Sequence, residues 1–279
     1  MKRKILVTLA TLILIILPFL LGILIGKYSP YVETNSFETY VIIWTLISIA
    51  LASVSVFRLK YSSKTFCIPL VLLVCPIIGI VGLAAPPDLS LKMLEHPERE
   101  HLRYIFLFKA AILFGIFYLF LFKSNWVKTK KSTKFIMTVF FMVAFAEFIW
   151  EFTHHYLYPE ALKEWVNQGK NAEEFGKNYD NLTVINVGVL GRLIQFSFTI
   201  WLSLQLYKYR QIKIWSPIIT IIFSLIGIVS AIVIYINQMN IPKGFEILFL
   251  FFIPGIPFLL LYWLGVALLT KSNKSQIAT

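Results

Sequence analysis

The four histidines of the chain all lie in two short stretches, residues 95–101 and 147–155. Each stretch contains one Glu-x-x-His unit. This spacing places the two side chains of a unit on one face of a helix. Two such units on facing helices are the ligand pattern of carboxylate-bridged dimetal sites. The pattern predicts a divalent metal site, for zinc, iron or manganese, with the ligands Glu98, His101, Glu151 and His154.

The same four residues allow two other interpretations. Without a metal, His154 or Glu151 could act as a general base, because burial can tune either group towards neutral pH. Alternatively, the four residues form a polar rim where helix ends meet water, and acidic side chains suit a helix N-terminus electrostatically. The sequence leaves the three interpretations open. His155 is expected to be a wet interfacial residue.

Three further charged residues, Lys109, Glu147 and Arg192, lie inside apolar segments. At about 1.5 Å per residue, each lies about 20 to 24 Å above the basic inner end of its segment, so the three share one depth. A charge inside a membrane is costly and indicates a functional site with a charged partner. We expect Glu147 to pair with Lys109, Arg192 or both, either as a functional group or as a structural ion-pair network.

Polar residues recur at steps of three or four along three consecutive segments, which places each set on one helical face. We expect the three faces to line one cavity that opens to the outside. The sets are Glu98, His101, Ile105 and Lys109; Glu147, Glu151 and His154; and Gly188, Arg192, Gln195, Thr199 and Ser203.

The elements that must position these residues are membrane helices. The chain is 58% hydrophobic and 14% charged, whereas a soluble domain is nearer half apolar and about a quarter charged. Apolar runs long enough to cross ~30 Å of hydrocarbon recur along the chain. We predict an all-α polytopic membrane bundle, a single domain over 1–279. The expected spans are roughly 5–26, 39–57, 65–85, 104–122, 135–152, 183–207, 215–236 and 246–270.

Charge distribution predicts the orientation. If the N-terminus is cytoplasmic, most of the 26 Lys and Arg residues lie inside and none of the 14 Asp and Glu residues does. The positive-inside rule then puts both termini in the cytoplasm. The net charge of +12 is therefore a topology signal in a protein whose partner is the lipid bilayer, and nucleic acid is not expected as a partner. The Lys-, Ile- and Phe-rich composition is typical of a bacterial plasma-membrane protein.

Two local patterns concern the ends of the predicted spans. Residues 159–166 predict a short amphipathic helix, either lying on the outer membrane interface or forming a surface loop helix without membrane contact. The Pro254-Gly255-Ile256-Pro257 sequence interrupts the last span. We expect a proline kink there, while a broken helix that lines a transport site is the alternative.

Known motifs do not assign a family. Glu147 and Glu151 have the Glu-x-x-x-Glu spacing of undecaprenyl-pyrophosphate phosphatases, but the serine- and arginine-rich second motif of that family is absent. Intramembrane CAAX-type proteases also use glutamate and histidine, yet their paired-glutamate-to-arginine motif is missing. Walker, G-x-S-x-G and H-E-x-x-H patterns do not occur.

The first functional hypothesis is an outward-facing membrane enzyme, dependent on a metal or on acid–base catalysis, that acts on a lipid-linked or amphiphilic anionic substrate. Lys109 and Arg192 would hold the negative charge of that substrate. The second is a proton- or ion-coupled transporter that uses the Arg192–Ser203 stripe. The third is an accessory membrane subunit without chemistry. The candidate catalytic residues are Glu147, Glu151, His154, Lys109 and Arg192.

Overall fold

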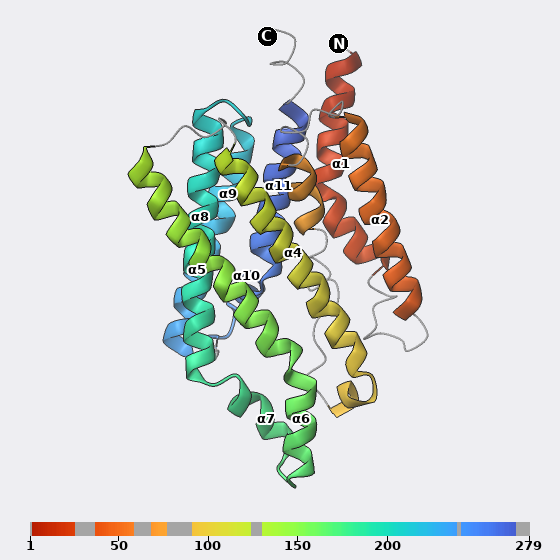
Figure 1. The fold of residues 1–279 in the computed structure, drawn as a ribbon, viewed down its shortest axis with the longest axis vertical. Helices are drawn as coiled ribbons and strands as arrows, with labels where there is room; N and C mark the ends of the chain where they lie inside the picture. The colour runs from red at the N-terminus through yellow and green to blue at the C-terminus, as the bar shows by residue number, and fades with distance from the viewer. Residues whose placement is uncertain are drawn as a thin grey trace.

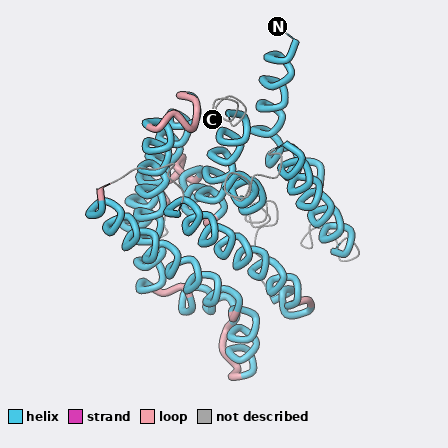
Figure 2. Tube along the Cα trace, turned by 45° about the horizontal axis from the view of Figure 1, so that its top comes forward, coloured by secondary structure: helices cyan, strands magenta, loops and turns pink. Residues whose placement is uncertain are grey.

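The computed structural model describes six parts of the chain. They are residues 2–25, 37–58, 68–76, 91–123, 130–238 and 241–271. Every regular element in these parts is a helix (Figure 2), so the all-α prediction is confirmed for them. The helices are α1 (Lys2–Ile25), α2 (Phe37–Arg58), η3 (Leu91–Glu95), α4 (Pro97–Lys123), α5 (Lys131–Tyr156), α6 (Tyr158–Asn167), α7 (Ala172–Tyr179), α8 (Leu182–Lys208), α9 (Trp215–Asn237), α10 (Ile247–Phe252) and α11 (Gly255–Lys271).

Four of the described helices are long and apolar enough to cross a membrane, which suggests a membrane protein. They are Pro97–Phe122, Lys131–Asn167, Leu182–Lys208 and Trp215–Asn237. Three shorter apolar helical segments are also present, namely Thr8–Leu20, Ile42–Val56 and Gly255–Thr270. The predicted count of eight spans is not confirmed. Most of the expected span 65–85 lies outside the described residues, which cover only 68–76 of it.

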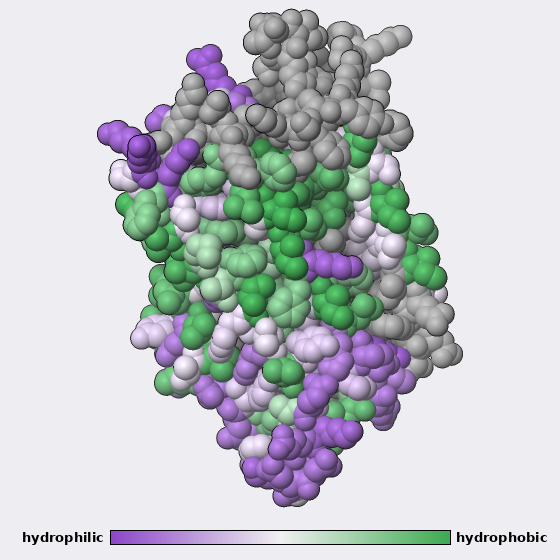
Figure 3. Space-filling model, in the orientation of Figure 1, coloured by the Kyte–Doolittle hydropathy of each residue, from purple (hydrophilic) through white to green (hydrophobic). Residues whose placement is uncertain are grey.

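The long helices lie side by side along the long axis of the molecule (Figure 1). The start of α1 and the end of α11 lie at one end, and α6 and α7 lie at the other. Apolar residues cover the middle of the visible surface, whereas hydrophilic residues gather over the α6–α7 end and near the start of α5 (Figure 3). An apolar belt between two polar ends is the surface expected of a membrane bundle. The side of the membrane at which each end lies stays a prediction.

Small residues let α8 and α9 approach closely, the packing mode of many membrane helices. The buried side of α9 includes a series of small or hydroxyl side chains. These are Ser216, Thr220, Ser224, Gly227 and Ser230, at steps of three or four. A Cβ on Gly227 would lie 2.3 Å from the Phe196 ring of α8, so that ring needs a glycine opposite. This close packing holds α8 between α9 and α5.

The last predicted span is broken into two helices, so the expected simple kink is wrong. Ile253 has extended backbone angles, φ −65° and ψ 139°. Proline at 254 explains the break, because its ring disfavours the helical conformation of the preceding residue and it has no N–H to donate. The Ile256 N–H then bonds to the carbonyl of Ile253 instead of that of Phe252. The Phe252 carbonyl is therefore released from the helical ladder.

The predicted helix at 159–166 is present as α6, and it continues the line of α5 with Pro159 in its first turn. Its apolar side packs against protein. Tyr158 and Leu162 are buried against Phe175 of α7 and Met93 of η3. The α6–α7 pair therefore forms a small cap with its own core at one end of the bundle (Figure 1), which differs from a helix that lies with its apolar side in lipid.

Candidate functional site

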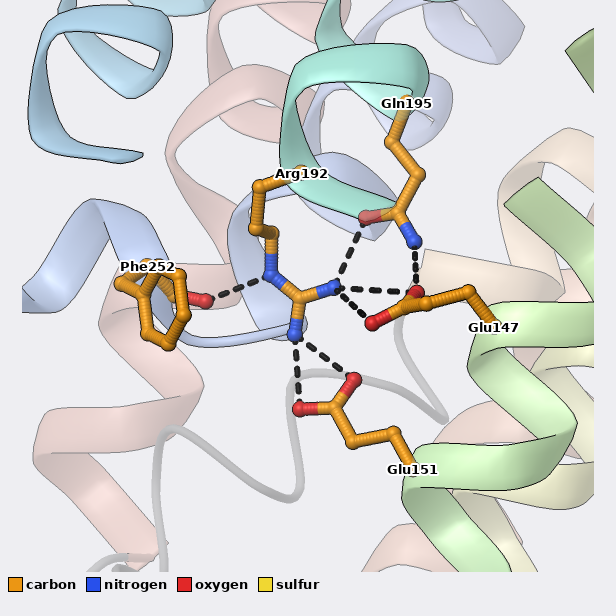
Figure 4. Close-up of polar contacts among 5 residues, drawn as sticks. All are labelled: Glu147, Glu151, Arg192, Gln195 and Phe252. Carbon is orange, nitrogen blue, oxygen red and sulfur yellow. Dashed lines mark hydrogen bonds and ion pairs between the residues drawn. The ribbon is translucent and has the colours of Figure 1, made fainter. Parts of the chain in front are cut away.

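Arg192 of α8 lies between two carboxylates of α5 (Figure 4). Its Nη2 donates to both carboxylate oxygens of Glu151, at 2.8 and 2.7 Å, and its Nη1 lies 3.5 and 3.4 Å from the oxygens of Glu147. Glu147 and Glu151 are four residues apart, so both project from the same side of α5. The sequence-based pairing of Glu147 with Arg192 is thus confirmed, and Glu151 joins it.

The remaining donors of Arg192 also have partners. Nε donates to the Phe252 carbonyl at 2.5 Å, and Nη1 donates to Gln195 Oε1 at 2.8 Å. The Gln195 amide in turn donates to Glu147 (Figure 4). The break between α10 and α11 therefore supplies an acceptor that an intact helix would have kept for its own backbone.

Apolar surroundings exclude water from the guanidinium of Arg192. Arg192 has 0% exposed surface, and the rings of Phe148 and Phe252 lie 5.8 and 5.6 Å from its guanidinium carbon. Charge interactions are much stronger in such a medium than in water. We refer to Glu147, Glu151, Arg192, Gln195 and the Phe252 carbonyl as the Arg192 network.

A glycine makes room for the network. A Cβ on Gly191 would lie 2.1 Å from Cδ of Glu147, so only glycine fits at this position while the carboxylate keeps its place. Gly191 directly precedes Arg192 on α8. Two neighbouring residues of α8 therefore have complementary roles. Arg192 is the counter-ion, and Gly191 leaves space for the Glu147 carboxylate.

The charges of the network do not cancel. One guanidinium and two ionised carboxylates sum to −1. Two carboxylates that share one counter-ion in a buried site favour protonation of one of them. One proton on either carboxylate would make the network neutral.

A small cavity lies beside the network on the α8 face. Its volume is about 10 Å³, room for about one water molecule, and Gln195 and Thr199 contribute its polar lining. The predicted α8 stripe is buried along its whole length, as expected. Thr199 and Ser203 donate to backbone carbonyls of their own helix. The polar side of α8 thus continues beyond the network towards the end of the helix at Lys208.

The predicted metal ligands do not meet. Glu98 pairs with His96 at 3.2 Å, His101 lies 2.9 Å from Glu160, and His154 lies 3.0 Å from Asp180, while Glu151 binds Arg192. No group of three or more His, Cys, Asp or Glu residues that could hold a metal occurs in the described ranges. The physical reason is competition, because the cap offers carboxylates to the histidines and Arg192 repels a second cation from Glu151.

Lys109 does not join the network either. Its side chain is exposed, and its ammonium lies 5.4 Å from the ring centroid of Phe106 on the same helix. Ile105, one turn earlier on the predicted α4 stripe, is 42% exposed. This stripe therefore faces outward, and the expected cavity shared by three polar faces is not formed by α4. The predicted direction of the Lys109 side chain was wrong, and its depth in the membrane stays a prediction.

His154 is held by aromatic rings and by a residue that sequence reasoning missed. Its ring stacks between Trp150, at 5.5 Å, and Tyr179, at 4.2 Å, and its Nε2 lies 3.0 Å from Oδ1 of Asp180. Tyr179 donates to the His154 carbonyl at 2.7 Å. Burial, with added repulsion from Asp180 and Glu160, raises the pKa of Tyr179 to about 12, so the phenol keeps its proton.

Asp180 lies just before Asn181, whose side chain caps the first turn of α8. His155, expected to be wet, is half-buried and stacks on the Tyr104 ring at 5.7 Å. Aromatic contacts of His155 therefore join α5 to α4, and those of His154 join α5 to α7.

Comparisons with models of protein families, with curated proteins and with solved structures found no match. The described helices have the length and composition of a multipass membrane protein. The catalytic and metal-binding roles predicted for individual residues stay predictions. The observations that bear on function are the geometry of the Arg192 network and its place beside a broken helix.

Proposed function

We propose that this chain is a proton-coupled membrane transporter in which Glu147 and Glu151 exchange the coupling proton and Arg192 is their counter-ion. The observation that carries the proposal is the sharing of one fully buried guanidinium by two carboxylates. The network has one negative charge in excess when both carboxylates are ionised. Uptake of one proton makes it neutral, so its charge can follow proton availability.

The break between α10 and α11 favours transport. Transporters of several folds use discontinuous helices near the membrane centre, because the backbone groups freed at the break can bind ions and substrates. Here the freed Phe252 carbonyl accepts from Arg192. Protonation of Glu151 would weaken its bidentate bond to the guanidinium. The link between α5, α8 and the break would then loosen, which is the differential interaction that a conformational change needs.

Graded exposure of the side chains suggests a proton route from the cap end. The exposed fraction is 33% for Asp180, 17% for His154, 14% for Glu151 and 4% for Glu147. His154 and Glu151 share one face of α5. In this proposal, Asp180 and His154 pass protons between water and Glu151, and the α8 stripe leads from the network towards the opposite end.

A second candidate is the outward-facing acid–base membrane enzyme on a lipid-linked or amphiphilic anionic substrate. The His154–Asp180 pair favours it, because a carboxylate that orients a histidine is a common acid–base arrangement. In this function, the chemistry would take place at the cap end and Glu147 would have a structural role. The two candidates therefore assign different importance to the buried network and to the outer pair.

A pH-jump experiment tests the transport proposal. The purified protein is reconstituted into phosphatidylcholine liposomes adsorbed on a supported membrane, and the current that follows a rapid change of external pH is recorded. Wild-type protein should give a current above that of empty liposomes. Glu147→Gln/Glu151→Gln should remove it, and Glu246→Gln, in the loop before α10, should leave it unchanged. A wild-type current equal to that of empty liposomes would exclude proton coupling.

A further inference from the structure

α10 is a short helix with little anchoring of its own. It has six residues, and none of them is buried. Gly244, with a φ of 92°, lies before it and the extended Ile253 follows it, so neither neighbouring helix continues into α10. Yet its last residue, Phe252, supplies the carbonyl that Arg192 binds. Contacts from outside α10 must therefore hold this carbonyl in place.

The apolar contacts of α10 do not fix its position along α9. The Phe251 ring lies 5.8 Å from the ring of Phe223 on α9, and a Cβ on Gly188 of α8 would lie 3.2 Å from the Phe252 ring. Burial of apolar surface is favourable but has no direction. A hydrogen bond, in contrast, restricts both distance and angle. The position of the Phe252 carbonyl therefore depends on a polar contact.

Ser230 of α9 makes that polar contact. Its Oγ donates to the Leu248 carbonyl of α10 at 2.6 Å, and its side chain is fully buried. Leu248 is the second residue of α10, and Phe252 follows it by four residues, about 6 Å further along the helix axis. The Ser230 bond therefore fixes α10 one turn before the carbonyl that accepts from Arg192.

The packing of α8 against α9 brings Ser230 to the level of Arg192. The two helices are joined by a short turn and run antiparallel, and the contact between Gly227 and Phe196 gives their register. Ala231 follows Gly227 by four residues and Arg192 precedes Phe196 by four, so these two residues lie at one level. Ser230 directly precedes Ala231. Helix α9 can thus act on the network through α10.

Ser230 differs from the other hydroxyl residues on the buried side of α9. The hydroxyl groups of Ser216, Thr220 and Ser224 have no hydrogen-bond partner among the described residues. Their small size suits close packing of membrane helices, a need that alanine would also meet. The Ser230 hydroxyl binds the backbone of another helix. Close packing alone does not account for that bond.

We propose that Ser230 is a positioning residue of the Arg192 network, because its bond to Leu248 holds the Phe252 carbonyl against Arg192. Without this bond, α10 can shift and Nε of Arg192 loses its acceptor. A buried donor without a partner is costly, so the guanidinium would turn within the network. The contact itself is independent of transport, whereas its consequence for proton coupling rests on the proposed function.

Nuclear magnetic resonance of the Arg192 side chain tests this proposal on the full chain. The protein is prepared in detergent micelles with ¹⁵N-labelled arginine, and Arg192→Lys identifies the Nε–H signal that belongs to Arg192. In Ser230→Ala, this signal should shift, and its hydrogen exchange should rise about fivefold, the effect of one lost hydrogen bond of ordinary strength. Amide exchange of the α10 segment, followed by mass spectrometry, should rise as well.

Ser224→Ala is the matched control. Ser224 lies on the same side of α9 and is 0% exposed, and its hydroxyl has no partner among the described residues. This variant should leave the Arg192 signal and the exchange of α10 unchanged. Equal changes in Ser230→Ala and Ser224→Ala would overturn the proposal, because looser packing of α8 against α9 would explain both. An unchanged Arg192 signal in Ser230→Ala would also overturn it.

The pH-jump current separates this inference from the proposed function. Ser230→Ala should reduce the transferred charge, since Arg192 no longer keeps its place between the carboxylates, and Ser224→Ala should not. A wild-type protein without current would exclude proton coupling, while the resonance experiment would still test the position of Arg192. A shifted Arg192 signal with an unchanged current would overturn the role of Ser230 in coupling.

Discussion

Arg192 and Lys109 are two cations within long apolar helices, and they lie in opposite environments. Arg192 is fully enclosed and bound by two carboxylates, an amide and a carbonyl. Lys109 is exposed and touches one aromatic ring. The enclosed arginine links α8 to α5 and to the break before α11, whereas the exposed lysine contacts a ring of its own helix. Depth alone therefore does not define the role of a charge in a membrane helix.

The difference follows from packing around each residue. Gly191 leaves space for Glu147, and Pro254 releases the Phe252 carbonyl, so α8 receives acceptors from two other helices. The α4 stripe has no comparable opening, and its apolar members face outward together with Lys109. Substitutions in the Arg192 network should consequently reduce stability more than substitutions at the exposed side of α4.

Removal of the guanidinium should have the largest effect. Arg192→Leu leaves Glu147 and Glu151 buried without a counter-ion, which should reduce the free energy of unfolding by about 3–5 kcal/mol. Equilibrium unfolding in mixed micelles measures this. Lys208→Leu, at the exposed end of the same helix, is the control and should change little. A loss of the same small size in both variants would show that the network does not stabilise the fold.

Filling the space beside Glu147 should come next. In Gly191→Ala, the added methyl group would lie on the carboxyl group, and overpacking of this kind costs about 1–3 kcal/mol. The pH-jump current should also fall, because Glu147 is displaced. Gly115→Ala is the matched control, since its Cβ would meet the Phe145 ring at 3.4 Å, an ordinary contact. Equal stability of the two variants would contradict the close approach of α5 and α8.

The two carboxylates should respond differently to neutralisation. Glu151→Gln removes the short bidentate contact with Arg192, and hydrogen bonds to charged groups contribute about 1.5–3 kcal/mol. Glu147→Gln should cost less, because its contacts with Arg192 are longer and the remaining charges then cancel. The double variant should be less stable than either. A greater loss of stability in Glu147→Gln than in Glu151→Gln would show that Glu147 makes the stronger contact with Arg192.

The outer pair should influence rate more than stability. Asp180→Asn keeps an oxygen near His154 but cannot carry a proton, so the rise of the pH-jump current should slow while its total charge is kept. The loss of stability should be about 1 kcal/mol. Glu164→Gln, exposed on α6, serves as the control. A rise time equal to that of wild type would exclude Asp180 from the proton route.

The smallest effect on the isolated protein is expected at the exposed cation. Lys109→Leu should change the melting temperature in detergent by less than about 2 °C, because among the described residues it loses one exposed ring contact. Both Lys109→Leu and Arg192→Leu replace a cation by leucine, so the difference between their effects on stability reports the difference between the two environments. A destabilisation as large as that of Arg192→Leu would mean that Lys109 is enclosed in the folded protein.

Much of the organisation could be predicted without coordinates. Hydropathy predicted the helical class and the long spans that hold the site, and helical steps of three and four predicted the buried α8 stripe. The pairing of Glu147 with Arg192 followed from their shared depth. The metal cluster was not found among the described residues, because the predicted ligands take separate partners. Asp180 was missed, since nothing in its own neighbourhood indicates a histidine 26 residues away.

The sequence by itself determined how far each charge lies along its own helix, because the helical rise per residue is fixed. Only the tertiary structure decided direction. Whether a side chain faces a neighbour or the surroundings depends on how helices rotate and pack. That rotation is set by distant residues, such as the glycine opposite Glu147 and the break before Pro254. Arg192 and Lys109 both lie within long apolar helices, and packing alone separates the buried network from the exposed lysine.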